Sequence, residues 1–226
     1  MTDRLTQSVR HQLGLGRLLP LGGARDGAWI AEEAAEAVLR RAVRGVRGVR
    51  LESLRIALAD PETAYEPVVP PPPSALPPGP LRISAQFAAT AREPLPTTAD
   101  RLRTGLATAA TELLGLAVAE VDLKVTALLD EEPEAAAVRP PEPPSAVVAD
   151  DPAAAAALTV PGVVGITAAL GQAVRSEAAL PRGHVRVEVA VDADHRALDV
   201  ARAVRERVGR ALPGHPTVTV LVTAAG

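Results

Sequence analysis

Three histidines and two aspartates near the C-terminus are the residues whose types could support metal or acid–base chemistry. His184 and His195 lie at opposite ends of a predicted strand, which holds them roughly 35 Å apart at about 3.3 Å per residue. His184 and His215 could share one sheet edge, because both precede strands joined by a helical crossover, but no carboxylate accompanies them. Asp192-x-Asp194-His195 resembles half of an acid–base pair. Its position just before a predicted helix, however, favours Asp194 as an N-cap. We therefore predict surface histidines and no metal site.

Other catalytic and cofactor motifs are missing from the sequence. There is no cysteine, which excludes disulfides, thiolate metal ligands and cysteine nucleophiles. No serine lies in a Gly-x-Ser-x-Gly elbow. Gly14-x-Gly16 lacks both the preceding strand and the third glycine of a dinucleotide-binding loop. We predict no enzyme activity, no cofactor and no small-molecule substrate.

The strongest charged cluster is a run of arginines: Arg40, Arg41, Arg44, Arg47 and Arg50. Such a patch could contact an anionic lipid surface, nucleic acid or an acidic partner. Glu32, Glu33 and Glu36 precede it on the same predicted helix, where i, i+4 pairs would give an ordinary solvated face, and this is the favoured interpretation. Nucleic acid is not expected as a partner, because three scattered aromatic residues provide no stacking platform.

A glycine motif occurs twice, as Gly45-Val46-Arg47-Gly48-Val49 and as Gly162-Val163-Val164-Gly165-Ile166. The first copy formally matches the GxxG loop of KH domains, which clamps a nucleic-acid backbone. However, it joins a predicted helix to a strand rather than two helices, and the second copy carries no charge. We interpret Gly45, Gly48, Gly162 and Gly165 as turn residues after a helix.

The same order of predicted elements follows each copy: a strand, a helix and a strand. They span residues 81–91, 100–114 and 121–129 after the first copy, and 185–191, 195–212 and 218–222 after the second. Apolar residues alternate in these strands and recur at helical spacing in these helices. We predict an α/β (α+β) protein of two tandem small domains. Each is a helix followed by strand-strand-helix-strand, with the helices packed on a three-stranded mixed sheet.

Composition sets the predicted boundaries: an N-terminal helix and loop at 1–25, a first domain at 26–129, an acidic Pro-rich linker at 130–149 and a shortened second repeat at 150–226. In the first domain, a helix capped by Asp26 runs to about residue 43, and a strand at 49–58 carries a bulge near Glu52 and Ser53. An insertion at 60–80 holds eight prolines between Pro67 and Pro80 and is predicted to be an extended spacer outside any sheet interior. The linker could fold back onto the arginine cluster, because residues 130–152 carry seven acidic groups and one basic group.

A longer pattern is shared with a known family. It comprises Ile30-Ala31, Ala34-Ala35, Gly45-Val46, Gly48-Val49 and Leu114-Gly115-Leu116-x-Val118-x-x-Val121-x-Leu123-x-Val125. It resembles the alkaline shock protein family of envelope stress response proteins over residues 28–129, and in outline over 150–223. The resemblance implies a small α/β domain without known catalysis. It also implies cytoplasmic proteins that assemble near the membrane, often through a membrane-embedded partner.

The expected function is therefore non-enzymatic interaction or assembly, by self-association or by binding a membrane-associated partner. Exposed sheet edges and alanine-rich helices would supply the surfaces. The alternative is polyanion binding through the Arg40–Arg50 cluster. No signal peptide or apolar run of about 18 residues is evident, so we expect a cytoplasmic protein, with a peripheral place at the inner membrane face only as the resemblance implies. The bias toward alanine, proline and arginine, with a single lysine, is typical of a high-GC bacterium.

Overall fold

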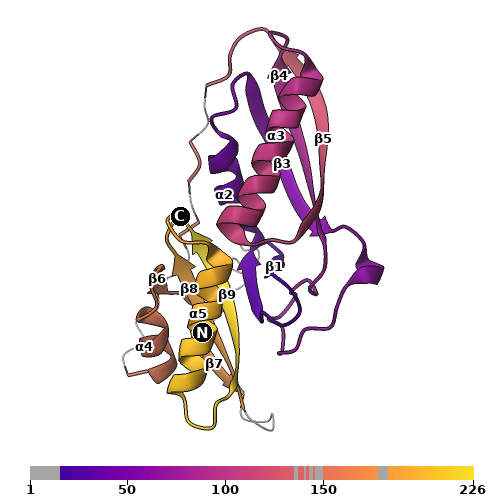
Figure 1. The fold of residues 1–226 in the computed structure, drawn as a ribbon. Coiled ribbons are helices and arrows are strands. Elements are labelled where there is room, and N and C mark those ends of the chain that lie inside the picture. Colours follow the sequence, from indigo (N-terminus) through magenta and orange to yellow (C-terminus); the bar gives the residue numbers. More distant parts are fainter. Residues whose placement is uncertain (1–15, 135–136, 140, 143–144, 146–149, 178–182) are drawn as a thin grey trace, which may run out of the picture.

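The computed structural model describes residues 16–134, 137–139, 141–142, 145, 150–177 and 183–226. The helix predicted near the N-terminus, at residues 2–13, lies outside these residues. Within them the protein is mixed α/β, with four α-helices packed on two mixed sheets (Figure 1).

The first sheet has three strands, in the order β3 (Val49–Leu58), β4 (Leu81–Thr90) and β5 (Val118–Leu129). β4 is antiparallel to β3 and parallel to β5. Helices α2 (Glu32–Val43) and α3 (Leu95–Ala109) cover one face (Figure 1). Because side chains alternate between faces, β4 buries Leu81, Ile83 and Phe87 in the core while Ser84 and Gln86 face solvent. The bulge predicted near Glu52 and Ser53 is confirmed by a register shift between Leu51 and Ser53.

The second sheet repeats this arrangement with shorter strands. β6 (Val163–Ile166) is antiparallel to β8 (His184–Val191), and β8 is parallel to β9 (Thr217–Ala225). A further short strand, β7 (Val174–Glu177), pairs with the same edge of β8 as β6 does. Helices α4 (Pro152–Leu158) and α5 (Ala197–Ala211) pack against each other and against this sheet.

The second sheet has six strands, not the predicted three, because β7 and an N-terminal hairpin of two strands join it. Strands β1 (Leu18–Leu21) and β2 (Ala28–Ala31) lie where a loop and the start of a helix were predicted. β2 pairs in parallel with β9, and α2 starts only at Glu32. Every residue of both strands is buried, so the hairpin shows no alternation of apolar and polar residues in the sequence. The chain therefore crosses into the second sheet before it builds the first.

The two glycine motifs correspond with a shift of three residues from the predicted pairing. Gly48 immediately precedes β3 and Gly162 immediately precedes β6, with φ angles of 71° and 90°. The Gly48 carbonyl accepts a hydrogen bond from Thr90 N–H, and the Gly162 carbonyl accepts one from Asp192 N–H, so each glycine meets the end of the neighbouring strand. Gly45, by contrast, lies in the turn after α2 without a positive φ, and Gly165 lies inside β6 rather than in the predicted turn; both have open space around them. The structural match is therefore Val-x-Gly-Val, at residues 46–49 and 160–163.

The Pro-rich insertion is not a free spacer, because it packs along the second sheet. Trp29 Nε1 donates to the Leu76 carbonyl at 3.0 Å, and Thr219 Oγ1 donates to the Pro70 carbonyl at 2.8 Å. Val69 is buried in the core. The segment is not extended throughout as predicted, because a short 3₁₀ helix, η1 (Pro61–Thr63), and several turns interrupt it, and its carbonyls accept hydrogen bonds from side chains of the sheet. The insertion thus connects β3 to β4 and at the same time covers β2 and β9.

Candidate interaction surface

The arginine cluster divides into residues used inside the fold and residues left exposed. Arg40 donates to Glu36 Oε1 at 2.8 Å and to the carbonyls of Leu51 and Glu52 at 3.1 and 3.0 Å. Arg41 donates to the carbonyl of Ala225 at the end of β9. The Glu36–Arg40 pair confirms the predicted i, i+4 pairing, whereas the backbone contacts make Arg40 and Arg41 structural links.

Arg44, Arg47 and Arg50 are exposed, but their surroundings carry both charges. Arg44 and Arg50 line a cavity of about 400 Å³ together with Glu33, Glu36 and Glu134. The start of the acidic linker does return to this region, as the sequence suggested. Glu132 accepts a hydrogen bond from Gly48 N–H at 2.6 Å and pairs with Arg92 at 3.3 Å. The cavity is therefore not a uniformly basic surface.

The three histidines near the C-terminus do not form a reactive cluster in the described part of the chain. His184 is buried, contrary to the prediction, and its Nδ1 lies 2.9 Å from Thr217 Oγ1. His195 and His215 are exposed, and His195 Nδ1 donates to Asp192 Oδ1 at 2.8 Å. Asp192, not Asp194, closes the turn before α5, since its carboxylate also accepts the N–H of His195. Among the described residues, no three histidine, aspartate or glutamate side chains come together as metal ligands would.

Two charged residues of β8 are buried, although the alternation of the sequence predicts them on a solvent face. Arg186 and Glu188 lie 3.5 Å apart, with 8 % and 0 % of their side chains exposed. The Nε of Arg186 has no hydrogen-bond partner among the described residues. Complete burial raises the pKa of Glu188 to about 7, although the N–H of Leu170 and the charge of Arg186 act in the opposite direction.

Folding stability is expected to fall as pH rises from 5 to 8 because of Glu188. Its pKa is 4.5 when unfolded and about 7 when folded, so the native state holds the extra proton between these values. The stability is complete below pH 4.5 and is lost as pH rises through 7, by roughly 3 kcal/mol. Urea unfolding at pH 5 and pH 8 measures the change, and Glu188→Gln should lack it. An unchanged pH slope in Glu188→Gln would assign the effect to other groups.

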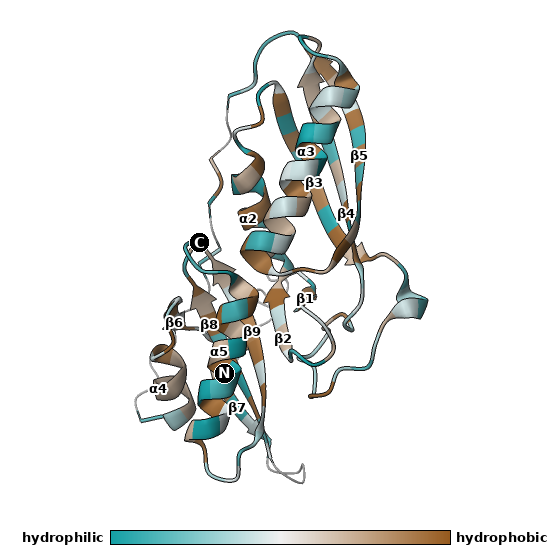
Figure 2. Ribbon diagram, in the orientation of Figure 1, coloured by the Kyte–Doolittle hydropathy of each residue, from teal (hydrophilic) through white to brown (hydrophobic). Residues whose placement is uncertain are grey.

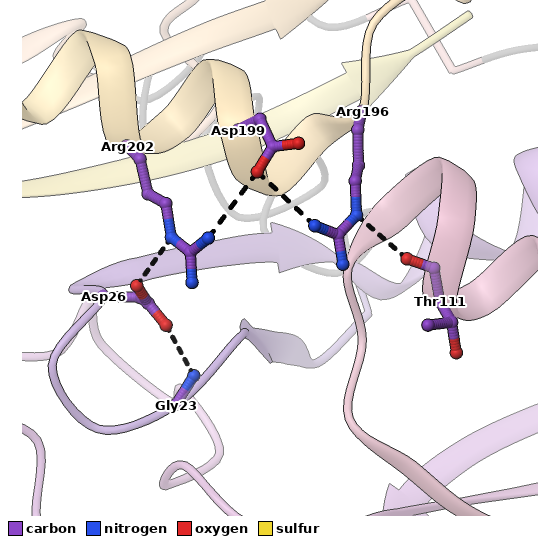
Figure 3. A network of polar contacts seen from close by, with 6 residues as sticks. All are labelled: Gly23, Asp26, Thr111, Arg196, Asp199 and Arg202. Carbon is purple, nitrogen blue, oxygen red and sulfur yellow. Dashed lines mark hydrogen bonds and ion pairs between the residues drawn. The ribbon is translucent and has the colours of Figure 1, made fainter.

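A network of polar contacts joins α5 to residues from the first half of the chain (Figure 3). Arg202 Nε donates to Asp26 Oδ1 at 2.8 Å, and Arg196 Nε donates to the Thr111 carbonyl at 3.0 Å. Asp199 lies between the two guanidinium groups, at 3.4 and 3.6 Å. Asp26 thus anchors the β1–β2 turn to α5 rather than capping α2 as predicted. The contact between Arg196 and Thr111 joins α5 to the turn that follows α3 and so links the two sheets.

The edge of β3 is closed by side chains. A strand edge without a neighbour presents unpaired N–H and C=O groups to any other extended chain. On β3, Arg40 already occupies two carbonyls, as described above. Further along, Arg17 Nη2 donates to the Ile56 carbonyl at 2.6 Å, and Glu32 Oε1 accepts the Ile56 N–H at 3.3 Å. Another strand could pair with β3 only by displacing these groups.

The edges of the second sheet are also protected. Along β1, Leu18 forms a bridge with Ala75 of the Pro-rich insertion and accepts the N–H of Leu76. At the other edge, β6 and β7 have four residues each. β7 carries the Arg175–Glu177 pair, and short charged strands are poor templates for pairing.

The β5 edge is the exception among the described strands. β5 has twelve residues and pairs only with β4. Val125 and Leu128 are 37 % and 61 % exposed. Figure 2 shows hydrophobic and hydrophilic residues along this strand at the border of the sheet. The one side-chain hydrogen bond to its backbone among described residues comes from exposed Arg103, which reaches the Val121 carbonyl at 3.4 Å. β5 is therefore the longest unprotected edge.

Comparison of the chain with protein-family models, with curated proteins and with solved structures found no match. In the described part of the chain, no helix is both long and apolar enough to cross a membrane.

Proposed function

We propose that this protein is a non-enzymatic interaction and assembly protein that associates through the edge of β5. The observation that carries the proposal is the contrast between edges. Side chains, the Pro-rich insertion or short charged strands protect the other edges described. β5 is twelve residues long, has a single long side-chain hydrogen bond to its backbone among the described residues, from Arg103 to the Val121 carbonyl, and exposes Val125 and Leu128. Strand addition to such an edge gives affinity through main-chain hydrogen bonds and specificity through alternate side chains.

A function in assembly agrees with the resemblance to the alkaline shock protein family. That family would place the protein in the cytoplasm, peripheral to the membrane, with a partner that is another copy or a membrane-associated protein. We also propose that the two halves are tandem domains derived from one unit, because strand directions and the Val-x-Gly-Val turn recur in both.

Val125→Lys is expected to weaken association by at least tenfold, since it places a charge on the apolar part of the edge. Val68→Lys is the matched control: Val68 is 57 % exposed but lies in the Pro-rich insertion, away from β5. Sedimentation velocity across a concentration series compares the two variants with the wild-type protein. Equal association of the Val125→Lys and Val68→Lys proteins would count against the β5 edge.

Polyanion binding through the arginine cluster is the second candidate. Its support is the exposure of Arg44, Arg47 and Arg50, and it is weakened by the internal contacts of Arg40 and Arg41. Salt distinguishes the two functions, because contacts to phosphates weaken steeply as salt rises while main-chain strand pairing does not.

A further inference from the structure

We propose that the occupant of the β5 edge is a second copy of this chain, paired antiparallel about a two-fold axis at Leu123. The inference rests on the proposed function of β5 and specifies its partner and register. The two three-stranded sheets would then form one continuous six-stranded sheet, with β5 of each copy at the centre.

Symmetry leaves few registers. A two-fold axis perpendicular to the sheet keeps each face on its own side, so paired residues must point to the same face. In β5, Glu120, Asp122 and Lys124 lie opposite Arg82, Ser84 and Gln86 of β4, on the face away from the helices. Val121, Leu123 and Val125 lie opposite core residues of β4, on the helix face. The axis must therefore pass through a residue, and each choice sets which charges meet.

Charge selects one of these registers. An axis at Lys124 brings two lysines together, and an axis at Val121 brings Glu120 against Asp122 of the second copy. An axis at Asp122 pairs Glu120 with Lys124 of the second copy twice, but it also brings two aspartates together at the axis between these pairs. An axis at Leu123 instead places Asp122 opposite Lys124 of the second copy, and symmetry makes this pair twice. An axis at Val125 sets Lys124 against Thr126 and gains no opposite charge.

The participating side chains are available for these contacts. Asp122 has 61 % of its side chain exposed, even though it lies 3.5 Å from Arg82. Lys124, the single lysine of the chain, is exposed and makes no ion pair with any described residue. On the helix face, the same register puts Val121 opposite the second copy's Val125 and Leu123 opposite itself, which buries their apolar surface.

Two irregularities in β5 limit the length of the pairing. The register with β4 shifts between Leu81 and Arg82 and again between Phe87 and Ala88, which leaves Ala119 and Thr126 of β5 as bulged residues. The regular stretch is therefore 120–125. Bulges end strand pairing, so this geometry supports a closed dimer and disfavours an open-ended stack.

Charge exchange tests the register. Asp122→Lys makes both cross pairs Lys against Lys, and Lys124→Asp makes both Asp against Asp, so each variant alone should dimerise at least about tenfold more weakly than the wild-type protein. An equimolar mixture of the two restores two opposite pairs and should form heterodimers. The double variant Asp122→Lys/Lys124→Asp should dimerise as the wild-type protein does. Sedimentation velocity measures association, and circular dichroism with thermal unfolding checks that each variant is folded.

The outcomes distinguish the register of the dimer from the use of the β5 edge for association. If the single variants associate as tightly as the wild-type protein while Val125→Lys does not, the register is wrong and the β5 edge stands. A wild-type protein that remains monomeric at the highest accessible concentration overturns the second copy as occupant. If, in addition, Val125→Lys binds every protein partner as the wild type does, the proposed function of β5 fails as well.

Discussion

Gly115→Ala is expected to lower the free energy of unfolding by about 3 kcal/mol. Gly115 ends the π-helical turn η2 (Ala110–Leu114) that continues α3, and its φ is 83°. An alanine there costs about 1 kcal/mol in the left-handed region. Its Cβ would also meet Leu198 of α5, lying inside contact distance of that residue's Cβ and 2.8 Å from its Cδ2. Overpacking of this kind costs about 1–3 kcal/mol. Urea unfolding measures the loss.

Gly214→Ala is the matched control. Gly214 has a similar φ of 78°, and a Cβ there would meet nothing within 4 Å. This variant should lose only the conformational part, about 1 kcal/mol. The difference between the two variants then isolates the contact of Gly115 with Leu198, where the two halves meet. Equal losses of unfolding free energy in Gly115→Ala and Gly214→Ala would show that the contact between Gly115 and Leu198 does not hold the two halves of the protein together.

Glu32→Gln is expected to destabilise the protein by about 2 kcal/mol. Glu32 is 7 % exposed and accepts hydrogen bonds from Arg17 N–H, Nε and Nη2 and from Ile56 N–H. A glutamine side chain has one acceptor oxygen and no charge, so the guanidinium of Arg17 and part of the β3 edge lose their partner. Arg17 is 39 % exposed, and water limits the loss. Chemical denaturation at pH 7 measures it.

The effect of Glu32→Gln should also depend on pH. Burial raises the pKa of Glu32, but the hydrogen bonds from Arg17 and Ile56 outweigh it and hold the pKa below its ordinary value of 4.5. The stabilisation is therefore complete above pH 4.5 and is lost as pH falls through the lower native value. Glu36→Gln, which removes an i, i+4 pair with Arg40, is the control and should cost about 0.5 kcal/mol. A gap between wild type and Glu32→Gln that persists at pH 2 would contradict this account.

The sequence predicts the elements whose residues alternate between core and solvent. In β4, Leu81, Ile83 and Phe87 are separated by polar residues, so both the strand and its buried face could be predicted. The β1–β2 hairpin could not, because Leu18–Leu21 and Ala28–Ala31 are buried throughout and show no period. The sequence therefore predicts that α2 begins after a cap at Asp26, but the carboxylate of Asp26 binds Arg202 from distant α5.

The sequence predicts the type of interaction surface, an exposed strand edge, but not which strand provides it. The sequence places a strand at 121–129 and suggests that exposed edges mediate association, but it leaves the strand order open. Only the structure shows that β5 lies at the border of its sheet. Likewise, the spacing of Arg40 and Arg41 on α2 fits an exposed charged face as well as it fits contacts inside the fold. The carbonyl groups that accept their hydrogen bonds, at Leu51 and Ala225, lie in other elements. Long-range packing, which local patterns do not encode, decides both points.

Hydrogen–deuterium exchange at low and high protein concentration tests the role of β5 most directly. Exchange is read by mass spectrometry on peptides that cover β5 and β3. We predict that peptides spanning residues 118–129 exchange more slowly as concentration rises, while those spanning 49–58 are unchanged because their edge is already occupied by side chains. Unchanged exchange in β5 together with new protection around Arg44 and Arg50 would contradict the account and move association to the arginine cluster.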